Sequence, residues 1–427
     1  MQLQAVNVGT KHLGDYASIA ARGLMDEIRA LAEPFAGKRV LHLSATAFGG
    51  GVAEILYTLV PLMRDAGLDA EWQIIYGQDE FFDVTKTIHN ALQGDPTGLT
   101  EEQQEIFRRY NRLNAEALEG EYDFVIVHDP QPAGIIEQAR DHGAHWIWRC
   151  HIDLSTPNRQ VLDFLVPSIC RHDAAIFHRQ EYIPDTDALP PAWIWPPAID
   201  PLAPKNMALS TEDAAYIVDQ FGIDVDRPLI TQVSRFDPWK DPLGVIEAWR
   251  IVRESHPSIQ LALVGSMAHD DPEGWEYYNR TVEAAGGDPD IFILSNLNNV
   301  GSVEVNAFQV HSAAVIQKSI REGFGLTVTE ALWKGRPTVA GRVGGIVAQI
   351  QDRETGYLVD SVEECAEAIL AILEDPVEAR AMALRGKEFV RRNFLTPRLL
   401  RDWLALFNDL DGNGEAVSEL VTALRSG

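Results

Sequence analysis

The sequence predicts an α/β protein of two domains, each with a doubly wound parallel sheet. Three observations lead to this prediction. Short apolar segments alternate with longer amphipathic ones along the chain, as in parallel α/β sheets. A Pro-rich segment, WPPAIDPLAP, interrupts the alternation near its middle, and proline prevents regular ladders and stiffens linkers. The 427 residues also suffice for two or three domains at roughly 150 residues per domain.

The first half begins with apolar residues at helical spacing, which predict a helix over 16–31. A strand over 39–45 and the Gly-rich turn Gly49–Gly51 then precede a helix over 52–66. The other expected elements are strands over 70–76, 123–129, 145–153 and 173–179, with a helix over 105–118.

The second half restarts the same alternation after the Pro-rich segment. It predicts strands over 228–236, 259–265, 290–296, 313–319 and 337–341, and helices over 242–255, 273–286 and 327–334. Two such halves imply a cleft between them, because ligands of open α/β sheets bind at the carboxyl ends of the strands.

The charge balance excludes some classes of function. With 36 basic and 63 acidic residues the net charge is −27, which disfavours general binding to nucleic acids or anionic membranes. Three cysteines without ligand spacing predict free thiols in a reducing compartment and no metal site. No signal segment and no run of about 18 apolar residues is found, so we expect a cytoplasmic protein.

Gly49–Gly51 are three consecutive glycines between an expected strand and an expected helix. Such glycines let the backbone approach a ligand and direct N–H groups toward it. Their spacing is not that of the dinucleotide-binding fingerprint. A plain strand-to-helix turn explains the segment equally well.

Arg235 and Lys240 follow an expected strand in VSRFDPWKDP. The planar donor fork of arginine and the compact charge of lysine together suit a diphosphate. The alternative is a pair of solvated surface charges.

Glu322 and Glu330 flank the loop EGFG and the helix that begins near Leu326 or Thr327. The N-terminal N–H groups of a helix favour an anion, so two carboxylates at this place need hydroxyl groups as hydrogen-bond donors. A nucleotide sugar offers sugar hydroxyls, a diphosphate and a ribose diol in line.

Together, EGFGLTVTE, the earlier SRFDPWK and the Gly-rich loop resemble the retaining glycosyltransferases of the GT-B fold, a large group that includes sucrose, trehalose and lipid-sugar synthases. Four segments of the first half narrow the resemblance: SATAFGGGVAEIL, FFDVTKTIHNALQG, VHDPQP and WRCHIDLSTPN. They resemble the trehalose glycosyltransferring synthases, which join a nucleotide-activated glucose to free glucose, and also the related trehalose phosphorylases.

The resemblance implies the domains and their roles. An N-terminal acceptor-binding domain would span 1–200, with a C-terminal helix over 393–427 returning to it, and a nucleotide-sugar-binding domain would span 201–392. On the donor side, Arg235 and Lys240 would bind the diphosphate, Glu330 the ribose diol and Glu322 the hydroxyls of the donor glucose. Backbone N–H groups would cradle phosphate and sugar at Gly50, Gly51, Phe324, Gly325 and Leu326.

On the acceptor side, the resemblance places His151 beside the transferred glucose. The candidates for binding the acceptor are Lys86, His89, Asn90, Asp129, Gln131 and Asp153. The residues alone leave other interpretations open. His151 fits a core histidine at a strand end, and His128 with Asp129 fits a strand-ending Asx turn. His42, His172, His178 and His311 are interpreted as structural.

The implied reaction retains configuration without an enzymic nucleophile: a phosphate oxygen of the leaving group would deprotonate the acceptor hydroxyl on the same face. Two fixed cations would stabilise the departing charge, so no metal ion is expected to be required, with Mg²⁺ at most stimulatory. The expected partners are ADP-, UDP- or GDP-glucose, glucose and trehalose. The base, the direction of the reaction and the oligomeric state, a homodimer included, stay open.

The acceptor segments VTKTIHN and HDPQP contain Lys86 as their one cation. We therefore expect free glucose, and not glucose 6-phosphate, to be the acceptor. The alternatives are a trehalose phosphorylase, a retaining GT-B enzyme with a different acceptor, a GT-B hexosamine epimerase, and a non-catalytic sugar-binding regulator. A regulator would be expected to lack Arg235, Lys240 or Glu322, and the chain has all three.

Overall fold

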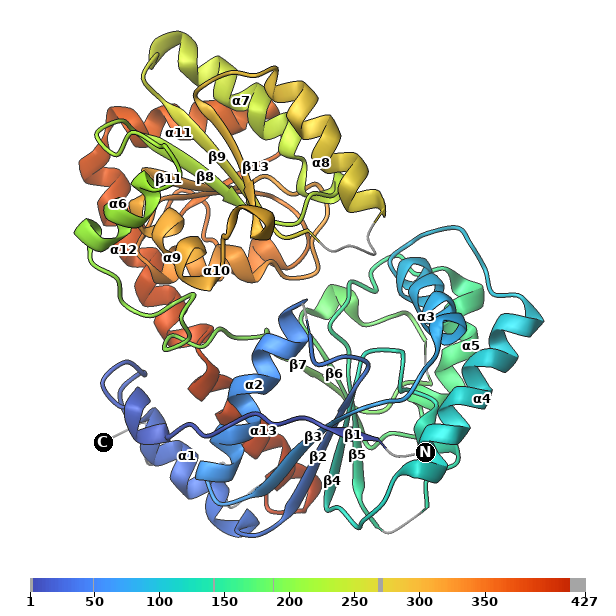
Figure 1. Cartoon of the computed structure of the whole chain (residues 1–427). Coiled ribbons are helices and arrows are strands. Elements are labelled where there is room, and N and C mark those ends of the chain that lie inside the picture. The colour runs from blue at the N-terminus through green and yellow to red at the C-terminus, as the bar shows by residue number, and fades with distance from the viewer. Residues whose placement is uncertain (1–2, 49, 141–142, 187, 268–271, 415–427) are drawn as a thin grey trace. The chain divides into compact units, whose positions relative to one another are not determined.

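The computed structural model describes residues 3–48, 50–140, 143–186, 188–267 and 272–414. The chain forms two compact units (Figure 1), one of Met1–Ala198 with Thr396–Gly427 and one of Ile199–Leu395. The chain therefore passes from one unit to the other within the Pro-rich segment and again just before its last long helix. Of the C-terminal segment 393–427, residues 415–427 lie outside the described residues. The substrate that each unit binds stays a prediction.

The first unit contains a seven-stranded sheet in the order β1-β3-β2-β4-β5-β6-β7, parallel except for the edge strand β1. Its strands are β1 (Gln4–Ala5), β2 (Arg39–Ser44), β3 (Asp69–Ile74), β4 (Phe124–His128), β5 (His145–Arg149), β6 (Ala174–Phe177) and β7 (Ala192–Ile194). Its α-helices are α1 (Leu24–Ala32), α2 (Gly50–Asp65), α3 (Asp79–Leu92), α4 (Glu101–Ala117), α5 (Arg159–Ile169) and α13 (Thr396–Leu410).

Residues that alternate along the strands supply two separate hydrophobic cores, one on each face of this sheet. Ile126 belongs to the core that contains α1, α2 and α13, whereas Val125 and Val127 belong to the core with α3, α4 and α5. Successive side chains of a strand point to opposite faces. The first unit is therefore doubly wound, with helices on both faces (Figure 1).

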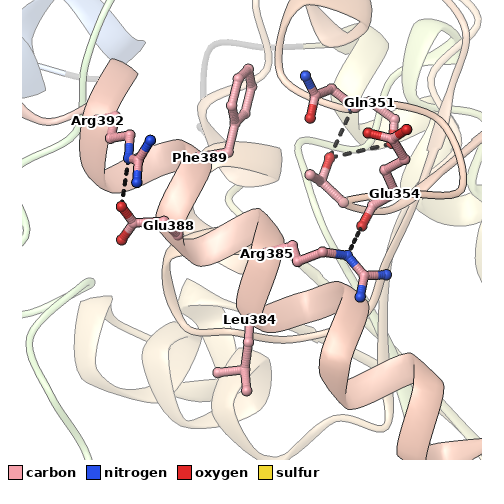
Figure 2. A pocket seen from close by; sticks show the side chains of 8 residues that line it. Gln351, Glu354, Leu384, Arg385, Glu388, Phe389 and Arg392 are labelled. Carbon is pink, nitrogen blue, oxygen red and sulfur yellow. Dashed lines mark hydrogen bonds and ion pairs between the residues drawn. The ribbon is translucent and has the colours of Figure 1, made fainter.

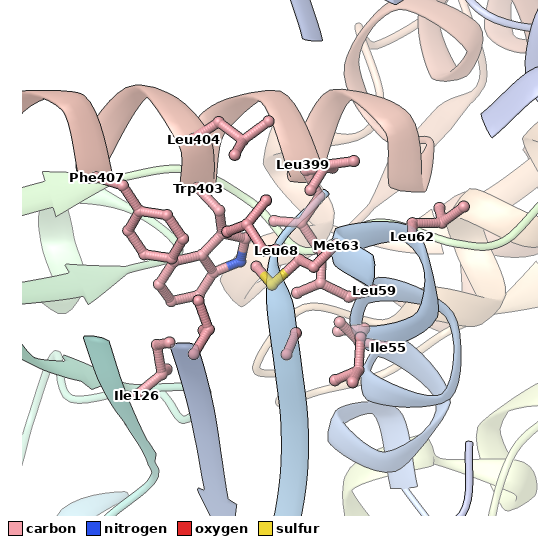
Figure 3. Close-up of a cluster of buried hydrophobic side chains, with 14 of the residues drawn as sticks. Ile55, Leu59, Leu62, Met63, Leu68, Ile126, Leu399, Trp403, Leu404 and Phe407 are labelled. Atoms are coloured by element: carbon pink, nitrogen blue, oxygen red, sulfur yellow. The ribbon is translucent and has the colours of Figure 1, made fainter. Parts of the chain in front are cut away.

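Helix α13 supplies much of one core although it lies at the far end of the chain. Trp403 and Phe407 point from α13 toward the sheet (Figure 3), and both side chains are at most 1% exposed. The ring of Phe407 stacks on Phe124 with 4.2 Å between centroids. Since full burial of one large apolar side chain contributes about 1.5–3 kcal/mol, α13 is an integral part of the first unit.

The second unit contains a six-stranded parallel sheet in the order β10-β9-β8-β11-β12-β13. Its strands are β8 (Leu229–Val233), β9 (Gln260–Gly265), β10 (Ile291–Ser295), β11 (Ala314–Gln317), β12 (Thr338–Gly341) and β13 (Tyr357–Val359). Its α-helices are α6 (Thr211–Asp219), α7 (Pro242–Ser255), α8 (Pro272–Ala285), α9 (Ser302–His311), α10 (Leu326–Trp333), α11 (Val362–Glu374) and α12 (Pro376–Asn393). One core includes residues of α7 and α11 and another residues of α6 and α9.

The prediction of two doubly wound parallel-sheet domains is confirmed, but several element bounds were wrong. The expected helix over 16–31 is a 3₁₀ turn, Leu13–Tyr16, followed by α1 from Leu24. Gly23, with φ of 80°, precedes α1 in the left-handed region, so a continuous helix cannot run through it. The strand expected over 145–153 ends at Arg149. The short strands β1, β7 and β13 were not predicted, because two or three residues show no alternation.

No helix in the described part of the chain is long and apolar enough to cross a membrane.

Candidate active site

The first group of candidate residues lies in the second unit, on the loops that follow β8 and β11. These strands are neighbours in the sheet, with Thr231 beside Val315, so both loops leave the same edge. Backbone contacts join the loops: the Ile320 N–H donates to the Trp239 carbonyl oxygen at 2.8 Å. Lys318 also forms an ion pair with Asp241. The β8 and β11 loops therefore form one connected surface.

Lys240 and Glu322 form the central ion pair of this surface. Lys240 Nζ lies 2.5 Å from Glu322 Oε2, and the two side chains are only 16% and 12% exposed. The hydroxyl of Ser319 donates to the same carboxylate oxygen at 3.4 Å. Lys240 is thus not a solvated surface charge, and the alternative interpretation from the sequence does not hold for it.

Arg235 joins this pair through Asp237, which the sequence analysis did not single out. Asp237 Oδ2 lies 3.2 Å from Arg235 Nη2, and Asp237 Oδ1 accepts a hydrogen bond from the Lys240 backbone N–H at 3.1 Å. The Asp237 side chain is 8% exposed, while that of Arg235 is 67% exposed. Burial raises the pKa of Asp237, against the opposing charges of Lys240 and Arg235. The guanidinium of Arg235 is therefore held by Asp237 and is still accessible to a ligand.

The loop before α10 brings backbone N–H groups to the same edge. Gly325 has φ of 83° and precedes α10, whose first residue is Leu326, as predicted. A side chain at Gly325 would place its Cβ 3.0 Å from Glu322 Cγ. Gln349 holds the loop by donating to the carbonyl oxygen of the buried Phe324. The left-handed backbone and the close carboxylate both require glycine at 325.

Glu330 lies inside α10 and is 1% exposed. Lys205 Nζ lies 3.0 Å from Glu330 Oε1, yet neither carboxylate oxygen accepts a hydrogen bond within the described residues. Burial lowers the pKa of the neighbouring Lys334 to about 7, although the charge of Glu330 opposes this shift. Lys334 Nζ donates to Asn206 Oδ1 at 3.1 Å. Glu330 is thus a buried carboxylate with unused acceptor capacity.

The first unit carries the other candidates, beginning with Gly50 and Gly51. They are the first two residues of α2, and Gly50 has φ of 77°. Their N–H groups belong to the helix's first turn, which has no partner within the helix. Gly49, the third glycine of the expected loop, lies outside the described residues.

Asp129 and His151 meet at the carboxyl ends of β4 and β5. Asp129 Oδ1 accepts a hydrogen bond from the His151 backbone N–H at 2.8 Å, and Asp129 itself has φ of 65°. Burial raises the pKa of Asp129 to about 7. The carbonyl oxygen of Asp129 also accepts from Trp148 Nε1 at 3.0 Å. Asp129 therefore forms the turn at the end of β4 and is also the predicted acceptor-binding residue, so the two interpretations from the sequence do not exclude each other.

His151 also contacts a second histidine. His128 Nδ1 lies 2.9 Å from His151 Nε2, and His128 Nε2 lies 3.0 Å from His42 Nδ1. The three residues come from neighbouring strands, since β4 pairs with both β2 and β5. His151 is half-buried and the other two are buried. His42 and His128 were thus missed as neighbours of a candidate site, because only strand pairing shows that they are adjacent.

The remaining acceptor candidates occupy α3 and the segments after β4 and β5. Lys86, His89 and Asn90 lie on α3 at a spacing that places them on one face, and Lys86 and Asn90 are exposed. Gln131 Oε1 is buried without a hydrogen-bond partner in the part of the chain described. Asp153 is 8% exposed and accepts from the Ser155 N–H at 2.8 Å. These contacts leave the acceptor assignments as predictions.

A separate hollow lies between α12 and the turn before β13, with a volume of about 450 Å³. Figure 2 shows Arg385 donating to the Glu354 carbonyl oxygen and Arg392 paired with Glu388 at its wall. None of the predicted site residues lines it, so it is not the candidate active site.

Among the residues that the structure describes, no group of three or more His, Cys, Asp or Glu side chains could hold a metal ion. Whether the reaction needs a metal stays a prediction.

Sequence reasoning also missed Lys205 and Asn206, which contact Glu330 and Lys334. Both belong to the segment that enters the second unit, far from α10 in the chain, and neither stands in a recognisable motif. Asp237, by contrast, stands within the quoted SRFDPWK and could have been found there as the residue between two cations.

Two families match the chain in succession. The family described as "Trehalose synthase, N-terminal domain" matches residues 42–184, and "Glycosyl transferases group 1" matches residues 215–389. Trehalose synthase of Rubrobacter xylanophilus is 60% identical over 96% of this chain and 100% of its own. Trehalose synthase of Pyrococcus horikoshii is 47% identical over 96% and 99%.

Solved structures share the fold at low identity. An α,α-trehalose 6-phosphate synthase from Burkholderia multivorans matches with a TM-score of 0.69 and 16% identity, over 90% of this chain and 98% of its own. A sucrose-phosphate synthase from Thermosynechococcus elongatus matches with a TM-score of 0.66 and 18% identity, over 88% and 99%. The fold is therefore that of the GT-B glycosyltransferases.

Proposed function

The chain belongs to the trehalose synthase family and is a glycosyltransferase, and from this premise we propose that it forms trehalose from a nucleoside-diphosphate glucose and free glucose. The reaction is reversible and retains the configuration of the transferred glucose. The donor binds the second unit, and the acceptor residues are carried by the first.

The observation that carries the proposal is the pairing of Lys240 with Glu322 on the β8 and β11 loops. A diphosphate needs cations, and a sugar needs acceptors for its hydroxyl hydrogens. The 2.5 Å pair presents both within one contact. Glu322 neutralises Lys240 while the site is empty. Once a donor arrives, Lys240 and the exposed Arg235 face the diphosphate and Glu322 accepts from the sugar. Charge that develops on the leaving diphosphate then meets cations already in place.

Glu330 supports a nucleotide sugar over inorganic phosphate as the donor-side ligand. A ribose diol offers two O–H donors, and Glu330 has two buried oxygens that accept no hydrogen bond among the described residues. An inorganic phosphate dianion is mainly an acceptor and has little hydrogen to donate to these two oxygens. Trehalose phosphorylase of Pleurotus pulmonarius is also related, at 26% identity over 89% of this chain and 58% of its own.

The test is product analysis with the purified protein. Glucose is incubated with ADP-, UDP- and GDP-glucose in separate reactions, and the disaccharide is identified by NMR of its anomeric protons. We expect α,α-trehalose from at least one donor. Trehalose is then incubated with the nucleoside diphosphate or with inorganic phosphate. Breakdown with phosphate alone would replace the proposal with a phosphorylase, and no trehalose in any reaction would contradict it.

A further inference from the structure

His42, His128 and His151 form a chain of three imidazoles across β2, β4 and the end of β5. The ring nitrogens are 3.0 and 2.9 Å apart, and neighbouring rings stack at 5.3 and 5.2 Å between centroids. The chain runs from the fully buried His42 to the half-buried His151. It therefore connects the apolar core to a residue of the candidate active site.

Burial keeps these rings neutral. It lowers the pKa of His42 to about 3, and it also lowers the pKa of His128 and of His151 well below the ordinary value. The guanidinium of Arg149 acts in the same direction on His128 and His151, and His178, whose ring lies 5.5 Å from that of His151, does so on His151. A neutral imidazole has one N–H donor and one acceptor nitrogen. Each ring-to-ring contact therefore needs one of each, and the chain has only two self-consistent directions.

Met63 selects one of these directions. Its Sδ lies 3.4 Å from His42 Nε2, inside the apolar core that Figure 3 shows. A thioether sulfur has no hydrogen to donate and can only accept. His42 must then carry its hydrogen on Nε2, which leaves His42 Nδ1 to accept from His128 Nε2. His128 Nδ1 in turn accepts from His151 Nε2.

We propose that Met63, His42 and His128 are positioning residues that hold His151 in its Nε2–H tautomer, so that His151 Nδ1 accepts a hydrogen bond from a sugar hydroxyl. This inference deepens the proposed function and rests on it for the identity of the ligand. In the opposite direction of the chain, a lone pair of His42 would face the sulfur, and His151 would present an N–H to the sugar. His151 could then only donate to the oxygen of the sugar hydroxyl. The hydrogen of that hydroxyl would stay unpaired unless another group accepted it.

The tautomer is measured without substrate by ¹⁵N NMR of the full chain with labelled histidine, since protonated and unprotonated ring nitrogens have different shifts. Signals are assigned by their loss in His151→Asn. We expect the Nε2–H form of His151. In Met63→Leu, which removes the acceptor at nearly constant volume, we expect a mixture of tautomers and a kcat about tenfold lower, with the KM for free glucose unchanged.

Met382→Leu is the matched control, because Met382 is a buried methionine, 2% exposed, in a hydrophobic core of the second unit that contains none of the three histidines. It is expected to leave the His151 signals and kcat as they are. An Nδ1–H tautomer of His151 in the unaltered protein overturns the inference, and so do unchanged signals and kcat in Met63→Leu. If Met63→Leu does not fold, the unaltered protein's spectrum decides. If the unaltered protein makes no trehalose, the proposed function fails, while the spectra still decide the tautomer.

Discussion

Lys240 and Glu322 are 82 positions apart in the chain, yet their charged atoms lie 2.5 Å from each other. They meet because β8 and β11 are neighbours in a parallel sheet, so that the loops after both strands leave the same edge. Asp237 and Ser319 complete the arrangement, one beside each partner. The two charges neutralise each other, and in the proposed function a bound donor pairs the cation with its diphosphate and the carboxylate with its sugar hydroxyls.

Replacing Arg235 or Lys240 with alanine is expected to lower kcat/KM for transfer by about 10²-fold or more, roughly 3 kcal/mol of transition-state stabilisation. Arg235→Ala should leave the thermal midpoint unchanged, because its side chain is 67% exposed and exposed ion pairs contribute little. Lys240→Ala should lower it, because Glu322 loses its partner. Arg385→Ala removes an exposed cation of the same unit and serves as the control. Near-normal rates in both variants would rule out their role at the diphosphate.

Glu330→Gln is expected to raise the KM for the nucleoside-diphosphate glucose while leaving the KM for free glucose unchanged. A hydrogen bond to a charged acceptor contributes about 1.5–3 kcal/mol, so the increase should be tenfold or more. The measurement is steady-state kinetics with each substrate varied in turn. An equal change in both KM values would point to a general disturbance of the fold instead of a ribose contact.

The acceptor is expected to be free glucose and not glucose 6-phosphate. Lys86 is the one cation of VTKTIHN and HDPQP, and its side chain is exposed, so nothing in these segments compensates a buried phosphate dianion. A site built around hydroxyl groups discriminates by roughly 10⁴-fold when the required pairing is lost. Initial rates with the two acceptors at equal concentration test this. Faster transfer to glucose 6-phosphate would place the enzyme with the trehalose-phosphate-forming synthases.

Asp129→Asn is expected to stabilise the protein more at pH 8 than at pH 4.5, relative to the unaltered chain. Burial raises the pKa of Asp129 to about 7 in the folded state, against about 3.9 in the unfolded state. Between these values the folded state binds more protons, so the contribution of Asp129 to stability is full below pH 4 and is lost as the pH rises through 7. Asparagine retains the acceptor for the His151 N–H without this loss.

The measurement for Asp129→Asn is the urea midpoint of both proteins at the two pH values. The buried histidines have lowered pKa values, which make stability rise with pH. Comparing the variant with the unaltered chain at each pH cancels this contribution, because both proteins contain the same histidines. A variant-to-unaltered difference that is the same at pH 4.5 and pH 8 would show that Asp129 titrates normally.

Trp403→Ala is expected to destabilise the first unit by about 3–5 kcal/mol, the usual cost of removing a large buried aromatic side chain. Trp403 is 1% exposed and packs edge-on against Trp195 and His42. Thermal unfolding followed by tryptophan fluorescence measures the effect. Leu384→Ala, at a side chain 52% exposed on α12, is the control. Equal midpoints for the two variants would mean that α13 contributes little to this core.

Local sequence was enough to predict the parallel α/β class and most of the longer strands. Helix α7 has the predicted bounds, Pro242–Ser255, because Asp241 caps it and a proline opens it. The start of α10 after Gly325 was also predicted, since glycine before a helix marks a backbone turn that other residues resist. In each case the deciding interactions lie within a few residues of one another.

The tertiary structure decided which of these features meet. Lys205 reaches Glu330 from the segment that enters the second unit, and Met63 reaches His42 from α2. No sequence motif indicates either contact, because both depend on strand order and helix packing between segments that are far apart in the chain. The surroundings of single residues were also decided by the tertiary structure. From the sequence, His42 is interpreted as a structural histidine and Lys240 could equally be a solvated charge. Strand pairing places His42 beside His128 and Lys240 against Glu322. The sequence motifs identify the residue types of this site, and the order of the strands decides which of these residues contact one another.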